Sequence, residues 1–147
     1  MKDKSSNKSI KVIFDTNVWI SFLIGKRLSS IQNHISNGQI SIITTEILIN
    51  EIKDVTSREK LKKYFPKQSV IELIDLLETI AEVVEIVPTH FISKDPKDNF
   101  LLDLVDFSKA DYLITGDKGL LAHNPFKTAI ILTPADFEKE LTLIALS

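Results

Sequence analysis

The stretch IKVIFDTN, residues 10–17, carries the strongest structural signal in this chain. Its first five residues are rich in β-branched and aromatic side chains, as is typical of a strand. Asp15 follows at the point where the apolar run stops. A strand this apolar is normally covered on both faces, as in a parallel sheet. The stretch therefore predicts a buried strand with a carboxylate at its carboxyl end.

Further apolar runs of the same character recur along the chain, and amphipathic stretches lie between them. This alternation predicts an α/β fold, a three-layer sandwich in which helices cover both faces of a central parallel sheet of about five strands. The further runs are QISII at 39–43, VVEIV at 83–87, YLIT at 112–115 and AIIL at 129–132.

The amphipathic stretches repeat apolar residues at spacings of three and four, which predicts helices. The first runs from Leu28 to Ile35, and Gly38 follows as a stop signal. The last is expected to begin at Thr133-Pro134, because threonine is a good N-cap and proline a favoured first helical residue. The apolar positions of the others are Ile47, Leu48, Ile52 and Val55; Val70, Ile71, Ile74, Leu77 and Ala81; and Leu101, Leu102 and Val105.

Length and composition fit one globular domain. The chain has 147 residues with 44% hydrophobic content, enough for one full core. We expect a disordered tail at residues 1–9 and a single domain at residues 10–147. The absence of cysteine excludes disulfides, thiolate zinc sites and cysteine nucleophiles.

The charge and hydropathy of the chain limit its location and its partners. The N-terminus lacks the apolar core of a signal peptide, and no later segment is apolar over the length of a membrane span. We therefore expect a soluble, cytoplasmic protein. The net charge of -2 provides no global basic field, so any contact with nucleic acid must be local.

Four acidic residues occupy positions where a chain normally places apolar or turn residues. Carboxylates brought together in a partly buried cleft raise each other's pKa unless a cation neutralises them. Mg²⁺ or Mn²⁺ takes oxygen ligands and keeps waters, which leaves room for a phosphate oxygen. The pattern predicts a divalent-metal site and phosphodiester chemistry. The four acids are Asp15, Glu51, Asp98 and Asp117.

Asp15 and Asp117 both follow apolar runs. In open parallel sheets, the functional crevice lies outside the carboxyl ends of the strands, near the point where strand order reverses. The two acids face each other if the strands that precede them are neighbours at that point. Aspartate also favours strand-to-helix turns and N-caps, and this simpler explanation remains open for each residue alone.

Glu51 lies on a predicted helix. At about 100° per residue, position 51 falls inside the arc of the apolar residues between Ile47 and Val55, which predicts a carboxylate aimed at the buried side. The alternative is a position at the edge of the core, from which the side chain reaches solvent or a lysine.

Asp98 lies on the apolar side of the predicted helix that contains Leu101, Leu102 and Val105. A structural alternative is a capping box that needs no metal, with Asp95 as the N-cap, Pro96 as the first helical residue and Asp98 as the third-position acid. The two roles are compatible, and Asp95 is itself a possible metal ligand. Asp103 and Asp106 are expected on the opposite, solvated face.

Four segments in combination resemble the PIN domain, in particular its bacterial toxin branch. They are VIFDTNVWIS, ITTEILINEIKDV, DPKDNFLLDLVDFSKADYLITGDKGLL and ILTPADF, and they cover nearly all of residues 10–141. The resemblance implies a metal-dependent ribonuclease with the sheet order 3-2-1-4-5, and it places the acidic quartet of the family on the four acids. Asn17 and Thr115 match polar motif residues that position ligands or substrate.

The resemblance also implies partners and a reaction. Such proteins are often the toxin of a type II toxin–antitoxin pair, with a cognate antitoxin, and commonly form homodimers. The expected reaction is in-line hydrolysis of RNA that leaves a 5′-phosphate, although metal-assisted hydrolysis does not by itself exclude DNA. No histidine is required, and we expect His34, His90 and His123 on the surface or in loops.

Residues 53–67, KDVTSREKLKKYFPK, form a basic segment with six basic and two acidic side chains. The segment is a candidate phosphate track for RNA, with Lys60, Lys62 and Lys63 as the expected contacts. The alternative is an ordinary solvated helix face whose two aromatic residues pack into the core or a dimer contact. Trp19 and Phe22 are likewise expected in the core or an interface.

Two other classes of function compete with a nuclease. A catalytically silent PIN-like module that binds RNA or a protein would be free to lose the four acids, yet all are present. A receiver-type signalling domain needs a phospho-acceptor aspartate after its third strand and a lysine after its fifth. VVEIVPTH lacks the first and AIILTPADF lacks the second. The nuclease is therefore the favoured interpretation.

Overall fold

The computed structural model describes residues 9–92, 95 and 98–146. Within these residues, five strands form one sheet in the order β3-β2-β1-β4-β5, and every pairing is parallel. The predicted fold class and strand order are confirmed. The strands are β1 (Ile10–Phe14), β2 (Ile40–Thr44), β3 (Glu82–Val83), β4 (Tyr112–Ile114) and β5 (Ile130–Leu132).

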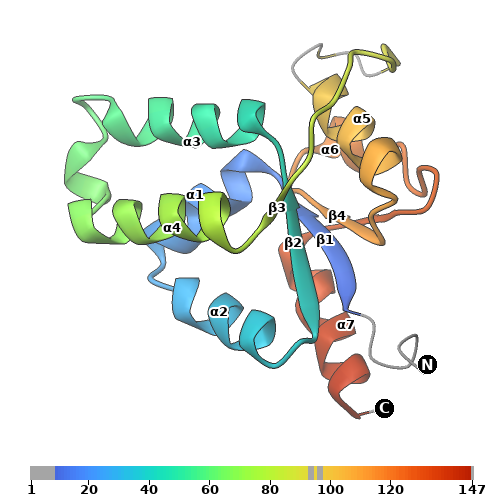
Figure 1. The fold of residues 1–147 in the computed structure, drawn as a ribbon, viewed down its shortest axis with the longest axis horizontal. Helices are drawn as coiled ribbons and strands as arrows, with labels where there is room; N and C mark the ends of the chain where they lie inside the picture. The colour runs from blue at the N-terminus through green and yellow to red at the C-terminus, as the bar shows by residue number, and fades with distance from the viewer. Residues whose placement is uncertain (1–8, 93–94, 96–97, 147) are drawn as a thin grey trace.

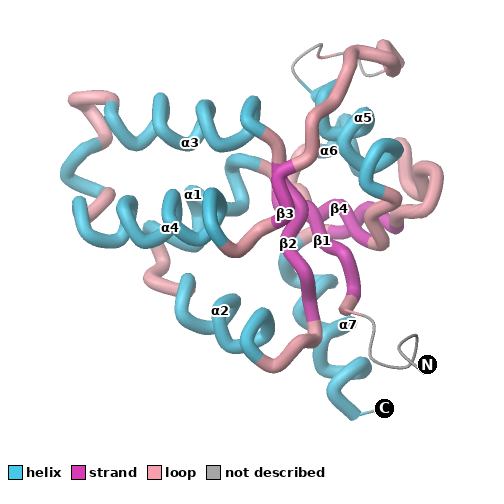
Figure 2. Tube along the Cα trace, viewed as in Figure 1, coloured by secondary structure: helices cyan, strands magenta, loops and turns pink. Residues whose placement is uncertain are grey.

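Helices connect the strands, and one further helix follows the last strand. They are α1 (Thr16–Ile24), α2 (Leu28–Ser36), α3 (Glu46–Ser57), a short 3-10 helix (Lys62–Tyr64), α4 (Lys67–Thr79), α5 (Asn99–Ser108), α6 (Lys118–Leu121) and α7 (Pro134–Leu146). Figure 1 shows α1 to α4 on one side of the sheet and α5 and α6 on the other. Figure 2 shows the strands between these two helical layers, which is the predicted three-layer arrangement.

β1 lies at the centre of the sheet. Its Ile10 is opposite Ile40 of β2, and its Phe14 is opposite Ile114 of β4. The chain moves outward from β1 to β2 and β3, and then crosses through α5 to β4 on the other side of β1. The strand order therefore reverses between β1 and β4, where ligands bind to sheets of this kind.

The core on one face is built around the buried ring of Phe14. Trp19 and Phe22 of α1 and Phe137 of α7 meet this ring edge-on, with centroid distances of 5.0, 5.4 and 5.9 Å. Burial of such side chains contributes roughly 1.5–3 kcal/mol each to folding. Trp19 and Phe22 are therefore core residues, which is one of the two places expected for them.

Two helix boundaries are confirmed. α2 ends before Gly38, whose φ of +76° suits glycine, and the N–H of Gly38 donates to Ile35 O at 3.0 Å. α7 begins at Pro134, and the hydroxyl of Thr133 accepts the backbone N–H of Asp136 at 3.2 Å. Both boundaries depend on local geometry, which is why short sequence signals predict them.

The strand predicted at 83–87 is wrong beyond Val83, where β3 ends. The N–H of Val84 still donates to Thr44 O at 2.8 Å, but the chain then leaves the sheet. Farther along, the backbone N–H groups of Thr89 and His90 donate to a side chain of α5. A tertiary contact with α5 thus holds the chain a few residues after it has left the sheet.

The stripe predicted for α4 is shifted. Leu73, Leu76 and Leu77 are its buried residues, whereas Ile71 of the predicted stripe is exposed. When several neighbouring residues of a helix are apolar, the sequence alone does not decide which of them face the core. In α4, the packing against α3 and β3 decides it.

Residues 1–8, most of the predicted tail, lie outside the described residues. Ser9 is described, and its hydroxyl donates to Gly38 O at 2.8 Å. Among the described residues, no helix combines the length and the apolar character required to cross a bilayer.

Candidate active site

An acidic cavity of about 720 Å³ lies at the carboxyl ends of β1 and β4. All four predicted acids line it, as does Asp95. They come from separate elements, because Asp15, Asp98 and Asp117 precede α1, α5 and α6, and Glu51 lies on α3. The other described lining residues are Thr16, Asn17, Asp54, Val55, Arg58, Phe100, Leu101 and Gly116.

Asp15 is the most buried of the four acids, at 8% exposed. Its N–H donates to Ile114 O at 2.9 Å, which continues the contact between β1 and β4. Burial raises the pKa of its carboxyl group, and the charge of Asp117 raises it further. Hydrogen bonds from Thr115 and from the backbone amides of Asn17 and Thr16 offset part of this increase. A nearby cation would stabilise the ionised form of such a buried carboxylate.

Thr115 connects the two central acids. The residue is fully buried, and its Oγ1 donates to Asp15 Oδ2 at 2.7 Å and accepts the N–H of Asp117 at 3.0 Å. The carboxylate of Asp117 in turn accepts the N–H of Leu120 at 3.3 Å, as the N-cap of α6. One hydroxyl therefore holds the side chain of one acid and the backbone of the other.

The neighbouring carboxyl group of Asp117 affects the protonation of Asp98. A hydrogen bond between two carboxyl groups requires that one of them be protonated. Burial, this hydrogen bond and the charge of Asp117 raise the pKa of Asp98 to about 7, and the charges of Asp95 and Asp15 act in the same direction. The acids of the cavity therefore repel one another, and binding of a proton or a cation relieves this repulsion.

Glu51 lies at the edge of the α3 core face, so its predicted place inside the apolar arc is wrong. Leu48 and Ile49 are buried there, whereas Ile47 is 44% exposed. Because Ile49 replaces Ile47 on the buried face, the face is rotated away from position 51. Glu51 still lines the cavity, and its Oε1 accepts a hydrogen bond from Thr16 Oγ1 at 2.6 Å.

Asp95 and Asn17 are exposed residues of the cavity wall. The helix α5 begins at Asn99, with Asp98 at the N-cap position, and the side chain of Asp98 makes no capping hydrogen bond. The N–H of Asp98 donates to Asp95 O at 2.9 Å, which keeps these two acids adjacent. Pro96, the predicted first helical residue, lies outside the described residues.

The donor atoms of the cavity suit a hard divalent cation, because carboxylate oxygens predominate. The raised pKa values of Asp98 and Asp15 indicate negative charge that a cation would neutralise. In the described part of the chain, no three acidic or histidine side chains already form a compact ligand group. The carboxylates of Asp15 and Glu51 contact threonine hydroxyls, so metal binding requires side chains to rotate or to share these contacts.

The three predicted RNA contacts do not belong to this cavity. Lys60, Lys62 and Lys63 are exposed, and none is among the described lining residues. Lys62 forms an ion pair with Glu59 at 3.4 Å. Of the two aromatic residues that the alternative interpretation expected to be packed, Phe65 is buried in the core, whereas Tyr64 is 50% exposed.

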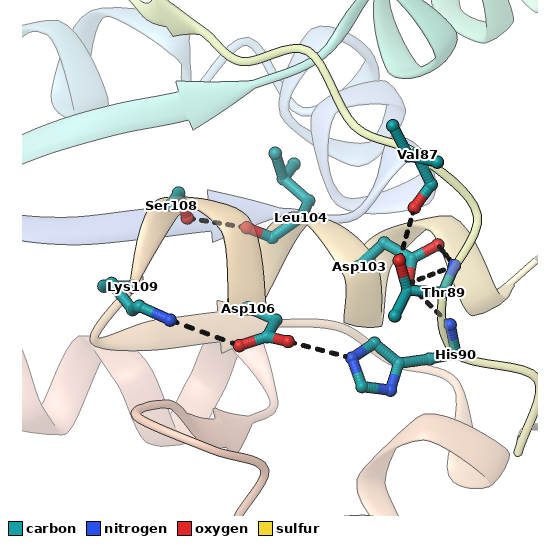
Figure 3. Close-up of polar contacts among 8 residues, drawn as sticks. All are labelled: Val87, Thr89, His90, Asp103, Leu104, Asp106, Ser108 and Lys109. Carbon is teal, nitrogen blue, oxygen red and sulfur yellow. Dashed lines mark hydrogen bonds and ion pairs between the residues drawn. The ribbon is translucent and has the colours of Figure 1, made fainter.

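The prediction that Asp103 is solvated is wrong. This residue of α5 is 2% exposed, and its carboxylate accepts the N–H groups of Thr89, at 3.2 and 3.3 Å, and of His90, at 2.8 Å. Figure 3 shows the carboxylate directed at these two amides. The buried charge is satisfied by backbone donors, and the segment that follows β3 is thereby attached to α5.

Asp106 is not fully solvated either, because His90 lies against it (Figure 3). His90 Nε2 donates to Asp106 Oδ2 at 3.1 Å, and the His90 ring packs edge-on against Phe126 at 5.1 Å. The hydrogen bond from His90, assisted by Lys109, holds the pKa of Asp106 below its usual range. His90 is a loop residue as predicted, but its ring is packed.

Three polar side chains of the cavity wall were not proposed as site residues from the sequence. Thr16 lies between two motif residues, in DTN, and this position was its only signal. Asp54 and Arg58 follow Glu51 at spacings of three and then four, which place all three on one flank of α3. That spacing could have assigned them to the site.

Comparison with known proteins agrees with this arrangement. The model of the PIN domain family matches residues 11–119, a range that includes all four acids. An uncharacterised protein of Methanocaldococcus jannaschii is 28% identical over 123 residues, which are 82% of this chain and 79% of that protein. Because the family model covers well over half of the chain, this protein is a member of the PIN domain family.

Proposed function

We propose that this protein is a divalent-metal-dependent endoribonuclease. PIN domains are generally nucleases that use divalent metals. The observation that carries the proposal is the meeting of the four acids in one cavity at the point where strand order reverses. The retention of all four favours catalysis over the alternative, a silent module that binds RNA or a protein.

The four acids would hold Mg²⁺ or Mn²⁺, with Asp95 as a possible further ligand. The bound ion would supply Lewis-acid activation of water and would neutralise charge at the phosphate and the leaving 3′-oxygen. Asp98 would serve as a ligand in its ionised form, and because its pKa is raised to about 7, metal binding would compete with its proton.

The surrounding side chains position these ligands. Thr115 orients Asp15 and holds the backbone of Asp117, and Thr16 orients Glu51. Asn17 is exposed on the cavity wall, where its amide can donate to a phosphate oxygen of the substrate. We expect products with a 5′-phosphate.

Cleavage of end-labelled single-stranded RNA tests the proposal. Wild-type protein should cut the RNA with Mn²⁺ or Mg²⁺, whereas EDTA or Asp15→Asn should abolish cutting. Asp75→Asn, which changes an exposed acid of α4, is the matched control and should keep the wild-type rate. Cleavage that survives EDTA or Asp15→Asn would contradict the proposal, and metal-dependent binding without cleavage would favour the silent module.

We also propose that the protein is the toxin of a type II toxin–antitoxin pair, acting in the cytoplasm as a homodimer and silenced by a cognate antitoxin. Membership of the PIN domain family supports this role. Induced expression in a bacterial host should arrest growth, and Asp15→Asn should relieve the arrest. A small open reading frame beside the gene should restore growth when co-expressed, and light scattering should give the mass of a dimer.

A further inference from the structure

The acidic cavity has a single basic residue, Arg58, among its described lining residues. A polyanion that enters the cavity meets strong repulsion, and a cation at its wall reduces this repulsion. The inference that follows rests on the proposed nuclease function. We propose that Arg58 binds a backbone phosphate of the single-stranded RNA substrate. The carboxyl side chains of the described wall are Asp15, Glu51, Asp54, Asp95, Asp98 and Asp117.

The backbone of Arg58 is held in place while its side chain is exposed. Its N–H donates to Val55 O at 3.3 Å, and its carbonyl oxygen accepts the N–H groups of Leu61 and Lys62, at 2.9 and 3.0 Å. Its side chain is 58% exposed. The end of α3 thus presents a guanidinium from a fixed point on the cavity wall.

The guanidinium of Arg58 forms an ion pair with Asp54. Arg58 Nη2 donates to Asp54 Oδ2 at 2.8 Å, and the side chain of Asp54 is 68% exposed. Ion pairs between exposed side chains are weak, so a phosphate can displace the carboxylate. The planar guanidinium suits a phosphate especially well, because it can donate two parallel hydrogen bonds.

Three other basic residues of the segment line a different cavity. Lys53, Lys62 and Lys67 line a separate cavity of about 600 Å³ at the α3–α4 junction. Lys53 forms an ion pair with Glu78 at 3.1 Å. The end of α3 contributes to both cavities, and Arg58 is the basic residue on the acidic side.

The chain offers a matched control. Arg27, on the link between α1 and α2, also forms an ion pair with an exposed acid, Glu138, and its side chain is 55% exposed. It lines a different cavity, between α2 and α7. Arg27→Ala therefore removes the same charge at the same exposure, away from the four acids.

RNA affinity is measured with labelled single-stranded RNA in Mg²⁺ at several salt concentrations, with every variant in the Asp15→Asn background to prevent cleavage. Arg58→Ala should weaken binding about tenfold and lower the salt slope by about 0.7, the value for one phosphate contact on a single strand. Arg58→Lys should give intermediate affinity with the wild-type slope, and Arg27→Ala should change neither. Asp54→Asn should tighten binding a few-fold, because a competing carboxylate is removed.

The outcomes separate this inference from the proposed function. If the wild-type protein cleaves RNA but Arg58→Ala matches Arg27→Ala in affinity and salt slope, the inference fails and the nuclease stands. If cleavage is absent but Arg58→Ala weakens binding as described, the nuclease fails and the phosphate contact stands. An equal loss of affinity for single-stranded DNA would support a contact to phosphate, and a wild-type protein that binds no RNA would overturn both. Melting temperatures verify that each variant is folded.

Discussion

A single hydroxyl group links two acids that lie far apart in the sequence. Thr115 belongs to the end of β4, yet it donates to the carboxylate at the end of β1. Loss of the donor would leave a buried carboxylate oxygen of Asp15 unsatisfied, at a cost of about 1–3 kcal/mol. The stability of the site and the orientation of its ligands therefore depend on the same atom.

Thr115→Val should lower the kcat/KM for RNA cleavage by about 10- to 100-fold at saturating Mn²⁺, because a ligand loses its orienting hydrogen bond. Thr115→Ser keeps the hydroxyl and should stay close to wild type. Single-turnover cleavage assays and metal titrations measure the effect. Equal rates for the two variants would show that the hydroxyl has no positioning role.

At the scale of elements, Asp103 holds the segment that follows β3. The carboxylate captures two consecutive backbone N–H groups and so attaches the segment after β3 to α5, the helix that Asp98 precedes. Charge-assisted hydrogen bonds of this kind are stronger than neutral ones. A residue outside the cavity thus holds residues 89 and 90 against α5.

Asp103→Asn should lower the free energy of unfolding by about 1.5–3 kcal/mol, because an amide replaces the charged acceptor and turns an N–H toward backbone donors. The backbone amides of Thr89 and His90 should exchange faster with deuterium. Asp106→Asn, on the same helix but partly exposed, is the control and should cost less than about 1 kcal/mol. Denaturant unfolding compares them, and equal losses would contradict a special role for Asp103.

The basic segment remains a candidate path for RNA beyond Arg58. Lys60, Lys62 and Lys63 follow that residue closely, so the three lysines could extend a contact that begins at the cavity wall. Replacing all three with alanine should weaken RNA binding and lower the salt slope by up to about 2, at about 0.7 per phosphate contact. Binding titrations at several salt concentrations measure this, and an unchanged slope would indicate an ordinary solvated surface.

At the scale of the whole molecule, the stability of the metal-free protein should depend on the protonation of Asp98. The pKa of Asp98 is 3.8 without perturbation and about 7 in the folded protein, so the folded chain retains a proton that the unfolded chain releases. This contribution is complete below the unfolded pKa and is lost as the pH rises through the folded pKa. Metal-free protein should therefore become less stable between weakly acidic and neutral pH.

Thermal unfolding in EDTA from about pH 5 to about pH 8 tests this expectation. As the pH rises, the melting temperature of the wild type should fall relative to that of Asp98→Asn. This variant lacks the titrating group, so the difference between the two proteins removes the contributions of all other titrating groups. Mg²⁺ should raise the wild-type melting temperature more at the higher pH, where the site is more negative. A wild-type minus variant difference that stays constant with pH would contradict the assignment.

Much of the architecture could be predicted because its signals are local. Apolar runs, helical spacing, Gly38 and Thr133-Pro134 each report on a few neighbouring residues, and the structure confirms the five strands, the helices and both of these helix boundaries. The acids at the ends of β1 and β4 were likewise predictable, since parallel strands bring their carboxyl ends to one edge. Predictions were weaker where several apolar residues compete, and Ile49 rather than Ile47 faces the core.

Contacts between residues distant in sequence have no local signal, and only the folded chain reveals them. Thr115 and Asp15 are 100 positions apart, and Thr16 and Glu51 are 35 apart, yet each pair is joined by one hydrogen bond. Asp103 resembles a surface acid until the segment after β3 supplies two amides to it. Alternating apolar patterns thus specify the layers and the strand ends, whereas the partners of the buried charges depend on which segments the tertiary packing brings together.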